Sequence, residues 1–236
     1  MKRLTIDVWS DIACPWCYIG KRRLEAALQR FPARDQIALR WHAFELDPNA
    51  PRQSKPGSQA AELAAKYRTS VAQAEAMMQR VVAAAAKEGL DFRFDQLVRA
   101  NTFDALRVIA YAFATGGEAL QAAVTERLMH AYFSEGAVLG DVETLVRVAS
   151  EVGVDGDALR ARLADGDFSD EVRADERRAQ EAGISGVPCF VLDWKYGISG
   201  AQEADVMLQA ITQAWDELPA ESPTVEGAAC TIDGCD

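Results

Sequence analysis

The chain has 236 residues, of which 49% are hydrophobic, and a formal net charge of -11 at pH 7. This length allows one large domain or two small ones, each with a sizeable core. The acidic balance argues against general binding of nucleic acids or anionic membranes, because both need a basic face. The longest apolar run, residues 81–86, is too short to cross a membrane, and the N-terminal segment lacks the apolar stretch of an export signal. We therefore expect a cytoplasmic protein.

The first fifty residues predict a strand, a helix and a second strand. Apolar side chains alternate within residues 4–9, residues 18–31 place them on one helical face, and residues 37–44 are typical of another strand. Pro32 ends the helix. Two strands joined by a helix form a right-handed βαβ unit, so we expect a sheet that is at least partly parallel.

Cys14 and Cys17 stand between the first strand and the helix. A thiol at a helix start lies near unpaired backbone amides and the positive end of the macrodipole, which favour the reactive thiolate. Pro15 suits the first helical turn because its missing N–H would be unpaired there, and neither Pro15 nor Trp16 adds a charge. This spacing fits a redox centre or a zinc site, and the βαβ context favours the redox centre.

A helical block follows the second strand. Three prolines between residues 46 and 57 predict a linker, and helical patterns then continue for about a hundred residues without a strand signal. Ser70 and Gln73 have the spacing of a capping box at the start of one helix. We expect residues 51–169, linkers included, to form an all-helical insertion domain.

The chain then returns to mixed patterns. Residues 170–183 predict a charged helix, residues 189–199 a strand that hairpins back, and residues 204–218 a closing helix. This order is that of an α/β thioredoxin-like fold with a helical insertion. The thioredoxin-like domain would comprise residues 1–50 and 170–218.

Residues 219–236 contain prolines, glycines and acidic residues, and predict a flexible C-terminal tail that carries Cys230 and Cys235. The Asp-Gly pair between these cysteines favours a turn that brings the two thiols together. A flexible tail could carry them to Cys14 and Cys17. Two interpretations follow: a second redox pair that exchanges with the first, or exposed thiols that oxidise incidentally.

Several segments match a known family. They are Cys14-Pro15-Trp16-Cys17-Tyr18-Ile19-Gly20-Lys21, Gly186-Val187-Pro188, Tyr196-Gly197-Ile198-Ser199-Gly200-Ala201-Gln202, Asn101-Thr102 and Tyr132-Phe133-Ser134-Glu135-Gly136. Together they resemble the FrnE-type branch of the DsbA family of thiol-disulfide oxidoreductases, and the likeness extends over nearly the whole chain. The resemblance implies a nucleophilic Cys14, a resolving Cys17 and a cis peptide before Pro188 that faces the pair.

The resemblance also implies a protein disulfide oxidase or isomerase. Its partners would be protein or small-molecule thiols and disulfides, with no nucleic acid or membrane and no cofactor or metal. Attack of a thiolate on a disulfide can lead to reduction, oxidation or isomerisation, and the reduction potential decides between them. The sequence does not give that potential.

Several positions depart from the family pattern or need interpretation. Cys189 stands where many relatives have an aromatic residue; we expect its thiol close to Cys14, either in a redox role or as a small buried side chain that fills space. Leu106 replaces a histidine that is frequent in relatives, so no proton-transfer role carries over. His42 and His130 are expected to pack or face solvent. Lys21 and Arg22, one or two turns along the helix, could help to stabilise the Cys14 thiolate, but we expect them to be solvated surface charges.

Two rivals remain open. Four thiolates from Cys14, Cys17, Cys230 and Cys235 could hold one zinc ion in a redox sensor. Glutathione-linked isomerases and kappa-class transferases share the expected fold, but they typically place serine where Cys14 stands.

Overall fold

A computed structural model describes residues 2–52 and 59–219. The tail cysteines Cys230 and Cys235 lie outside these residues. The elements, in chain order, are β1 (Leu4–Ser10), α1 (Pro15–Arg30), a 3-10 turn (Arg34–Gln36), β2 (Ile37–Ala43), α2 (Gln59–Tyr67), α3 (Val71–Lys87), α4 (Phe103–Glu135), α5 (Val142–Ser150), α6 (Gly156–Ala164), α7 (Ser169–Glu181), β3 (Cys189–Leu192), β4 (Tyr196–Ser199) and α8 (Ala204–Asp216).

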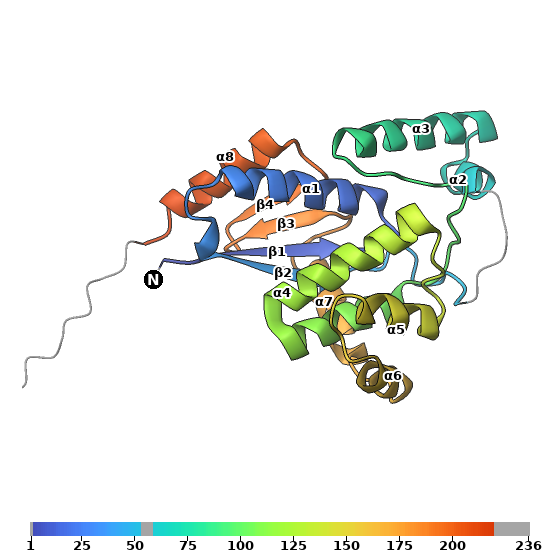
Figure 1. Cartoon of the computed structure of the whole chain (residues 1–236). Coiled ribbons are helices and arrows are strands. Elements are labelled where there is room, and N and C mark those ends of the chain that lie inside the picture. Colours follow the sequence, from blue (N-terminus) through green and yellow to red (C-terminus); the bar gives the residue numbers. More distant parts are fainter. Residues whose placement is uncertain (1, 53–58, 220–236) are drawn as a thin grey trace, which may run out of the picture.

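The four strands form one mixed sheet in the order β2-β1-β3-β4. β1 pairs parallel with β2 and antiparallel with β3, and β4 pairs antiparallel with β3. Figure 1 shows α1 and α8 on one face of this sheet, while α2 to α6 all come between β2 and β3 in the chain. The predicted α/β class and the parallel first strand pair are confirmed. The division into two domains stays a prediction.

Alternation along β1 separates the two faces of the sheet. Leu4, Ile6 and Val8 are fully buried in the core that α1 and α8 cover, whereas Trp9 packs on the other face against Ala179 of α7. This is the expected behaviour of a strand, in which successive side chains point to opposite faces. Both faces are buried, which leaves the ends of the strands as the place for a site.

The helix start predicted at Ser70 is confirmed. Ser70 and Gln73 form a capping box at the start of α3, with Ser70 Oγ accepting from the Gln73 N–H at 3.2 Å. α4 has a kink at Gly117, whose φ of 65° disrupts the helical backbone. Among the described residues no helix is long and apolar enough to cross a membrane.

Candidate active site

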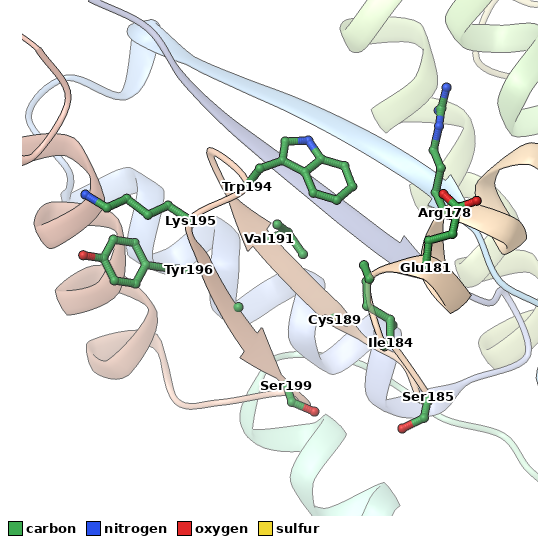
Figure 2. Close-up of a pocket in the computed structure, with 14 residues that line it drawn as sticks. Arg178, Glu181, Ile184, Ser185, Cys189, Val191, Trp194, Lys195, Tyr196 and Ser199 are labelled. Atoms are coloured by element: carbon green, nitrogen blue, oxygen red, sulfur yellow. The ribbon is translucent and has the colours of Figure 1, made fainter.

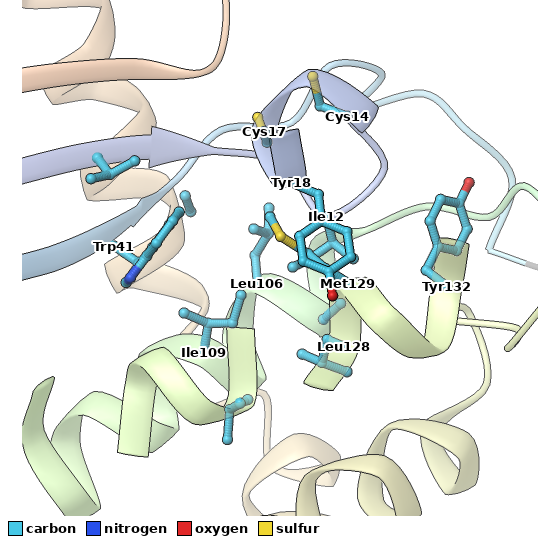
Figure 3. Packing of buried hydrophobic residues seen from close by; sticks show 14 of the residues in the cluster. Ile12, Cys14, Cys17, Tyr18, Trp41, Leu106, Ile109, Leu128, Met129 and Tyr132 are labelled. Carbon is cyan, nitrogen blue, oxygen red and sulfur yellow. The ribbon is translucent and has the colours of Figure 1, made fainter. Parts of the chain in front are cut away.

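Cys14 caps the start of α1. Its backbone is extended, with φ -89° and ψ 112°, and Pro15 takes the first helical position, as the sequence predicts. The Cys17 N–H donates to the Cys14 carbonyl at 3.0 Å, and the Cys14 N–H donates to the Asp11 carbonyl at 3.1 Å. These bonds fix the turn so that both sulfur atoms lie at the positive end of the helix (Figure 3).

The two thiols are free and differ in environment. Cys14 Sγ donates to the carbonyl of Val187 at 3.6 Å. Cys17 is 1% exposed. Burial raises the pKa of the Cys17 thiol well above its usual range, and the neighbouring Cys14 raises it further, while the Ser10 hydroxyl lowers it. Cys17 is therefore held as a neutral thiol.

The loop before β3 lies against the first two turns of α1. The Val187–Pro188 peptide is cis, which confirms the expectation drawn from the resemblance. A Cβ placed on Gly20 would come within 3.1 Å of Pro188 Cγ and 3.2 Å of Phe190 Cζ. A side chain at this position would force its neighbours to give by a few tenths of an ångström, so glycine favours the close approach of the loop to α1. The helix and the loop thus bring Cys14, Cys17 and Pro188 together.

Asp11 is a buried carboxylate next to the cysteine turn that the sequence interpretation did not single out. Its oxygens accept from the N–H of Leu46 at 2.8 Å and of Ala13 at 3.1 Å. Burial raises the pKa of Asp11 to about 6, although these bonds oppose the shift. The available signal was an acidic residue three positions before Cys14, just after the first strand pattern.

Cys189 does not face the cysteine pair, which corrects the expectation that its thiol lies close to Cys14. Cys189 pairs with Trp9 in the sheet and packs with Trp9 and Ala179 on the α7 side. The next residue, Phe190, belongs to the core that contains Cys14 and Cys17. Because side chains alternate along a strand, the two neighbours point to opposite faces.

Burial raises the pKa of the Cys189 thiol, which opposes a reactive thiolate. The thiol borders an open groove of about 670 Å³ between α7 and the β3-β4 hairpin, beside Ile184 and Trp194 (Figure 2). The interpretation of Cys189 as a small buried side chain that fills space agrees with this packing.

Lys21 is buried, so the prediction that it is a solvated surface charge is wrong. Its side chain is 4% exposed, and its ammonium group contacts Glu25 and lies 2.5 Å from Glu126 of α4. Glu126 also accepts from Tyr18 Oη at 2.6 Å and pairs with the half-buried Arg22. These cations are paired with carboxylates, and the pairs with Glu126 join α1 to α4.

The two histidines have different surroundings. His42 lies between two carboxylates, with Nε2 2.7 Å from Asp7 and Nδ1 2.8 Å from Asp175, and Trp9 stacks on its ring at 4.6 Å. His130 is exposed and lies 3.0 Å from Glu135. His42 is therefore packed, as expected, and its charged ring links β1, β2 and α7.

Leu106 is buried in the core below the cysteines (Figure 3).

The residues that the structure describes contain no group of three or more His, Cys, Asp or Glu side chains placed to hold a metal ion. The zinc site considered from the sequence needs Cys230 and Cys235, which lie outside those residues.

Comparison with known proteins agrees with this geometry. A family model for the DSBA-like thioredoxin domain matches residues 5–212. The crystal structure of a probable DsbA oxidoreductase from Streptomyces coelicolor is 43% identical, with a TM-score of 0.84 and 99% coverage of both chains. The Bacillus subtilis protein YwbO, which is uncharacterized, is 29% identical over 212 residues, 88% of this chain and 95% of its own.

More distant structures share the fold. The cytosolic disulfide reductase DsbM from Pseudomonas aeruginosa with GSH has 19% identity and a TM-score of 0.60, and the match covers 90% of this chain and 96% of that one. The predicted thioredoxin-like fold and the resemblance to the DsbA family are confirmed.

Proposed function

Since the chain belongs to the family of DSBA-like thioredoxin domains, we propose that it is a thiol-disulfide oxidoreductase of the FrnE type, with Cys14 as nucleophile and Cys17 as resolving thiol. The observation that carries this proposal is the position of Cys14 at the cap of α1, 3.6 Å from the Val187 carbonyl and one helical turn from Cys17. In this arrangement Pro188 completes the site by holding the loop against the cysteine turn.

The environment of each thiol supports its role. Cys14 stands at the N-terminal cap of α1, next to the unpaired backbone amides of the first helical turn. Cys17 is buried and its pKa is raised, so it does not compete as the first nucleophile. Trp16 between them is 41% exposed and offers an apolar contact to a substrate chain.

The reaction follows from thiolate chemistry. The Cys14 thiolate attacks a substrate disulfide, forms a mixed disulfide and releases one substrate thiolate. Cys17 then attacks the Cys14 sulfur, which closes the Cys14-Cys17 disulfide and releases the second substrate thiolate. The substrate gains two electrons and the enzyme pair loses two. The reverse sequence oxidises a dithiol, and escape through a substrate thiol gives isomerisation.

The substrates proposed are protein or small-molecule disulfides and thiols in the cytoplasm. A cytosolic disulfide reductase with GSH has the same fold, which supports glutathione as one small substrate. The related fold of a 2-hydroxychromene-2-carboxylate isomerase leaves a glutathione-linked isomerase as the rival function. The presence of Cys17 favours disulfide exchange, because an isomerase of that type needs no resolving thiol.

The experiment that tests this function is dithiol-dependent reduction of insulin, and refolding of scrambled ribonuclease, by the wild-type protein and the Cys14→Ser variant. The proposal requires both activities in the wild-type protein and the loss of both in the Cys14→Ser variant.

The proposal includes a second redox pair at Cys230 and Cys235, which exchanges disulfides with Cys14 and Cys17. Peptide mass spectrometry during turnover is expected to find a disulfide that joins one tail cysteine to Cys14 or Cys17. A tail pair that stays closed and never exchanges would remove this part of the proposal and leave the Cys14-Cys17 reaction intact.

A further inference from the structure

A cavity of about 300 Å³ lies along β2, the edge strand of the sheet, between α4 and α7. Its wall includes the consecutive residues Arg40 and Trp41, whose side chains point to opposite faces of β2, so the cavity reaches around the edge of the sheet. Cys14, Cys17 and Pro188 do not line it. The cavity is therefore distinct from the site at the start of α1.

Buried polar atoms without a protein partner line this cavity. They include Trp41 Nε1 of β2 and Thr125 Oγ1 of α4, which make no hydrogen bond within the described part of the chain. Trp41 is 5% exposed and Thr125 is 0% exposed. Trp9, which is also buried, shows the usual arrangement, because its Nε1 donates to the Asp175 carbonyl at 3.0 Å. The Trp41 N–H and the Thr125 hydroxyl are thus available to a molecule in the cavity.

Gln121 joins the elements that carry these two groups. Its side-chain amide accepts from the Trp41 backbone N–H at 3.0 Å and donates to the Trp41 carbonyl at 2.9 Å. Thr125 follows four residues later on the same face of α4, one helical turn away. Figure 3 shows the ring nitrogen of Trp41 turned away from Cys14 and Cys17. Trp41 and Thr125 therefore form one polar end of the cavity, on the side away from the cysteine turn.

The two groups define the chemistry of a ligand's polar end. An indole N–H only donates, whereas a threonine hydroxyl both donates and accepts. A single hydroxyl group on a ligand accepts from the first and donates to the second. The wall around them is largely apolar, with Ile12, Leu106, Ile109, Ala110 and Phe168. Since one water takes up ~30 Å³ of liquid, the cavity has room for about ten non-hydrogen atoms, the size of a single substituted aromatic ring.

The charges at the mouth favour a neutral ligand. Arg40, which lies over the Phe113 ring at 5.9 Å, and Glu171 are exposed and carry opposite charges. Arg178 pairs with Asp175 at 3.4 Å, so its charge is also balanced. Further in, Trp41, Thr125 and the apolar wall are uncharged. An ionised group placed beside them would be buried without a counter-charge, which is unfavourable.

We propose that this cavity binds a small phenol, a neutral aromatic ring with one hydroxyl group. The ring packs on the apolar wall, and the hydroxyl accepts from Trp41 Nε1 and donates to Thr125 Oγ1. Water is the competing occupant, but a largely apolar wall offers few of the two to four polar partners that each water needs. The inference goes beyond the proposed function and does not depend on the redox role of Cys14 and Cys17.

The test uses p-cresol as the probe and p-xylene as its matched control, because the two differ only by a hydroxyl in place of a methyl group. Reduced full-length protein labelled with ¹⁵N-tryptophan is titrated with each compound, and the indole N–H signals of its five tryptophans are followed by NMR. Trp41→Phe assigns the Trp41 signal by its loss. Isothermal titration calorimetry gives the affinities.

We expect p-cresol to bind saturably and to shift the Trp41 indole signal. The signals of Trp16, on the cysteine turn, and of Trp194, in the groove beside Cys189, should not move, because neither residue lines this cavity. The affinity for p-xylene should be at least about tenfold lower, since it leaves the Trp41 N–H and the Thr125 hydroxyl buried without a partner.

Thr125→Val keeps the shape of the side chain and removes its hydroxyl. This variant should bind p-cresol at least about threefold more weakly and p-xylene with unchanged affinity. Thr115→Val is the matched control on the same helix, because the Thr115 hydroxyl already donates to the Tyr111 carbonyl at 2.9 Å and does not line the cavity. It should keep the wild-type affinity for both compounds.

Absence of a saturable Trp41 shift with p-cresol up to ~10 mM would overturn the proposal and leave water as the occupant. Equal affinities for p-cresol and p-xylene, or a wild-type affinity for p-cresol in Thr125→Val, would overturn the assigned polar end. A shift confined to Trp16 or Trp194 would place binding elsewhere and overturn it as well. The two compounds are compared on the wild-type protein, so the result stands even if Trp41→Phe does not fold.

Discussion

The Cys14→Ser variant should lose dithiol-dependent insulin reduction by at least about 10³-fold, since a serine hydroxyl near neutral pH does not supply the anionic sulfur that attacks a disulfide. The substitution changes one atom, and the Cys14 backbone, which caps α1 without its side chain, keeps its bonds to Asp11 and Cys17. The loss therefore reports chemistry and not unfolding, which circular dichroism of the variant checks.

Cys189→Ser is the matched control. Cys189 is also a buried thiol, but it packs beside Trp9 and Ala179 on the opposite face of the sheet. Its variant should keep activity within about twofold of wild type. Insulin reduction that survives in Cys14→Ser would show that another group attacks the substrate and would remove Cys14 from the reaction.

The free energy of unfolding should fall by up to about 3 kcal/mol as the pH rises from 6.5 to 9, because the unfolded chain loses the His42 proton over this interval while the folded protein retains most of it. Burial acts to lower the pKa of His42, but its hydrogen bonds to Asp175 and Asp7 outweigh burial and raise the pKa from 6.5 to about 9. A pKa raised in the folded state stabilises the protein fully below the unfolded value, and the gain disappears as pH passes the folded value, at ~1.36 kcal/mol per unit.

Urea denaturation at pH 6 and pH 9.5 measures this change. His42→Gln should remove most of the slope, since glutamine does not titrate, and the part that remains near pH 9 comes from buried thiols such as Cys17, whose pKa is also raised. His130→Gln should preserve the slope, because His130 is exposed and pairs with the also exposed Glu135. A stability that stays constant in wild type between these pH values would contradict the assigned ion pairs.

Local patterns were sufficient for much of the fold. Alternating residues predicted β1 and β2, and the capping box predicted the start of α3. The position of the cysteine pair followed from the same kind of pattern, because a strand and a helix meet within a few residues and Pro15 marks the helical start. These features depend on neighbours in sequence, so the sequence carries them directly.

The features that were missed depend on distant partners. Lys21 has the charge of a surface residue, and its burial is stabilised by Glu126, 105 positions away. His42 owes its charge to Asp175, 133 positions away. Cys189 was placed on the wrong face because its orientation is set by the pairing of β3 with β1 and by the loop that precedes it. None of these contacts leaves a local pattern.

The measurement that tests the central claim most directly is capture of the mixed disulfide. The Cys17→Ser variant, reduced and mixed with oxidised glutathione, has a nucleophile but no resolving thiol. We predict one stable glutathione adduct per chain, assigned to Cys14 by peptide mass spectrometry, and in the wild-type protein the same adduct only transiently before the Cys14-Cys17 disulfide closes. An adduct on Cys189, Cys230 or Cys235 with Cys14 left free would contradict the account.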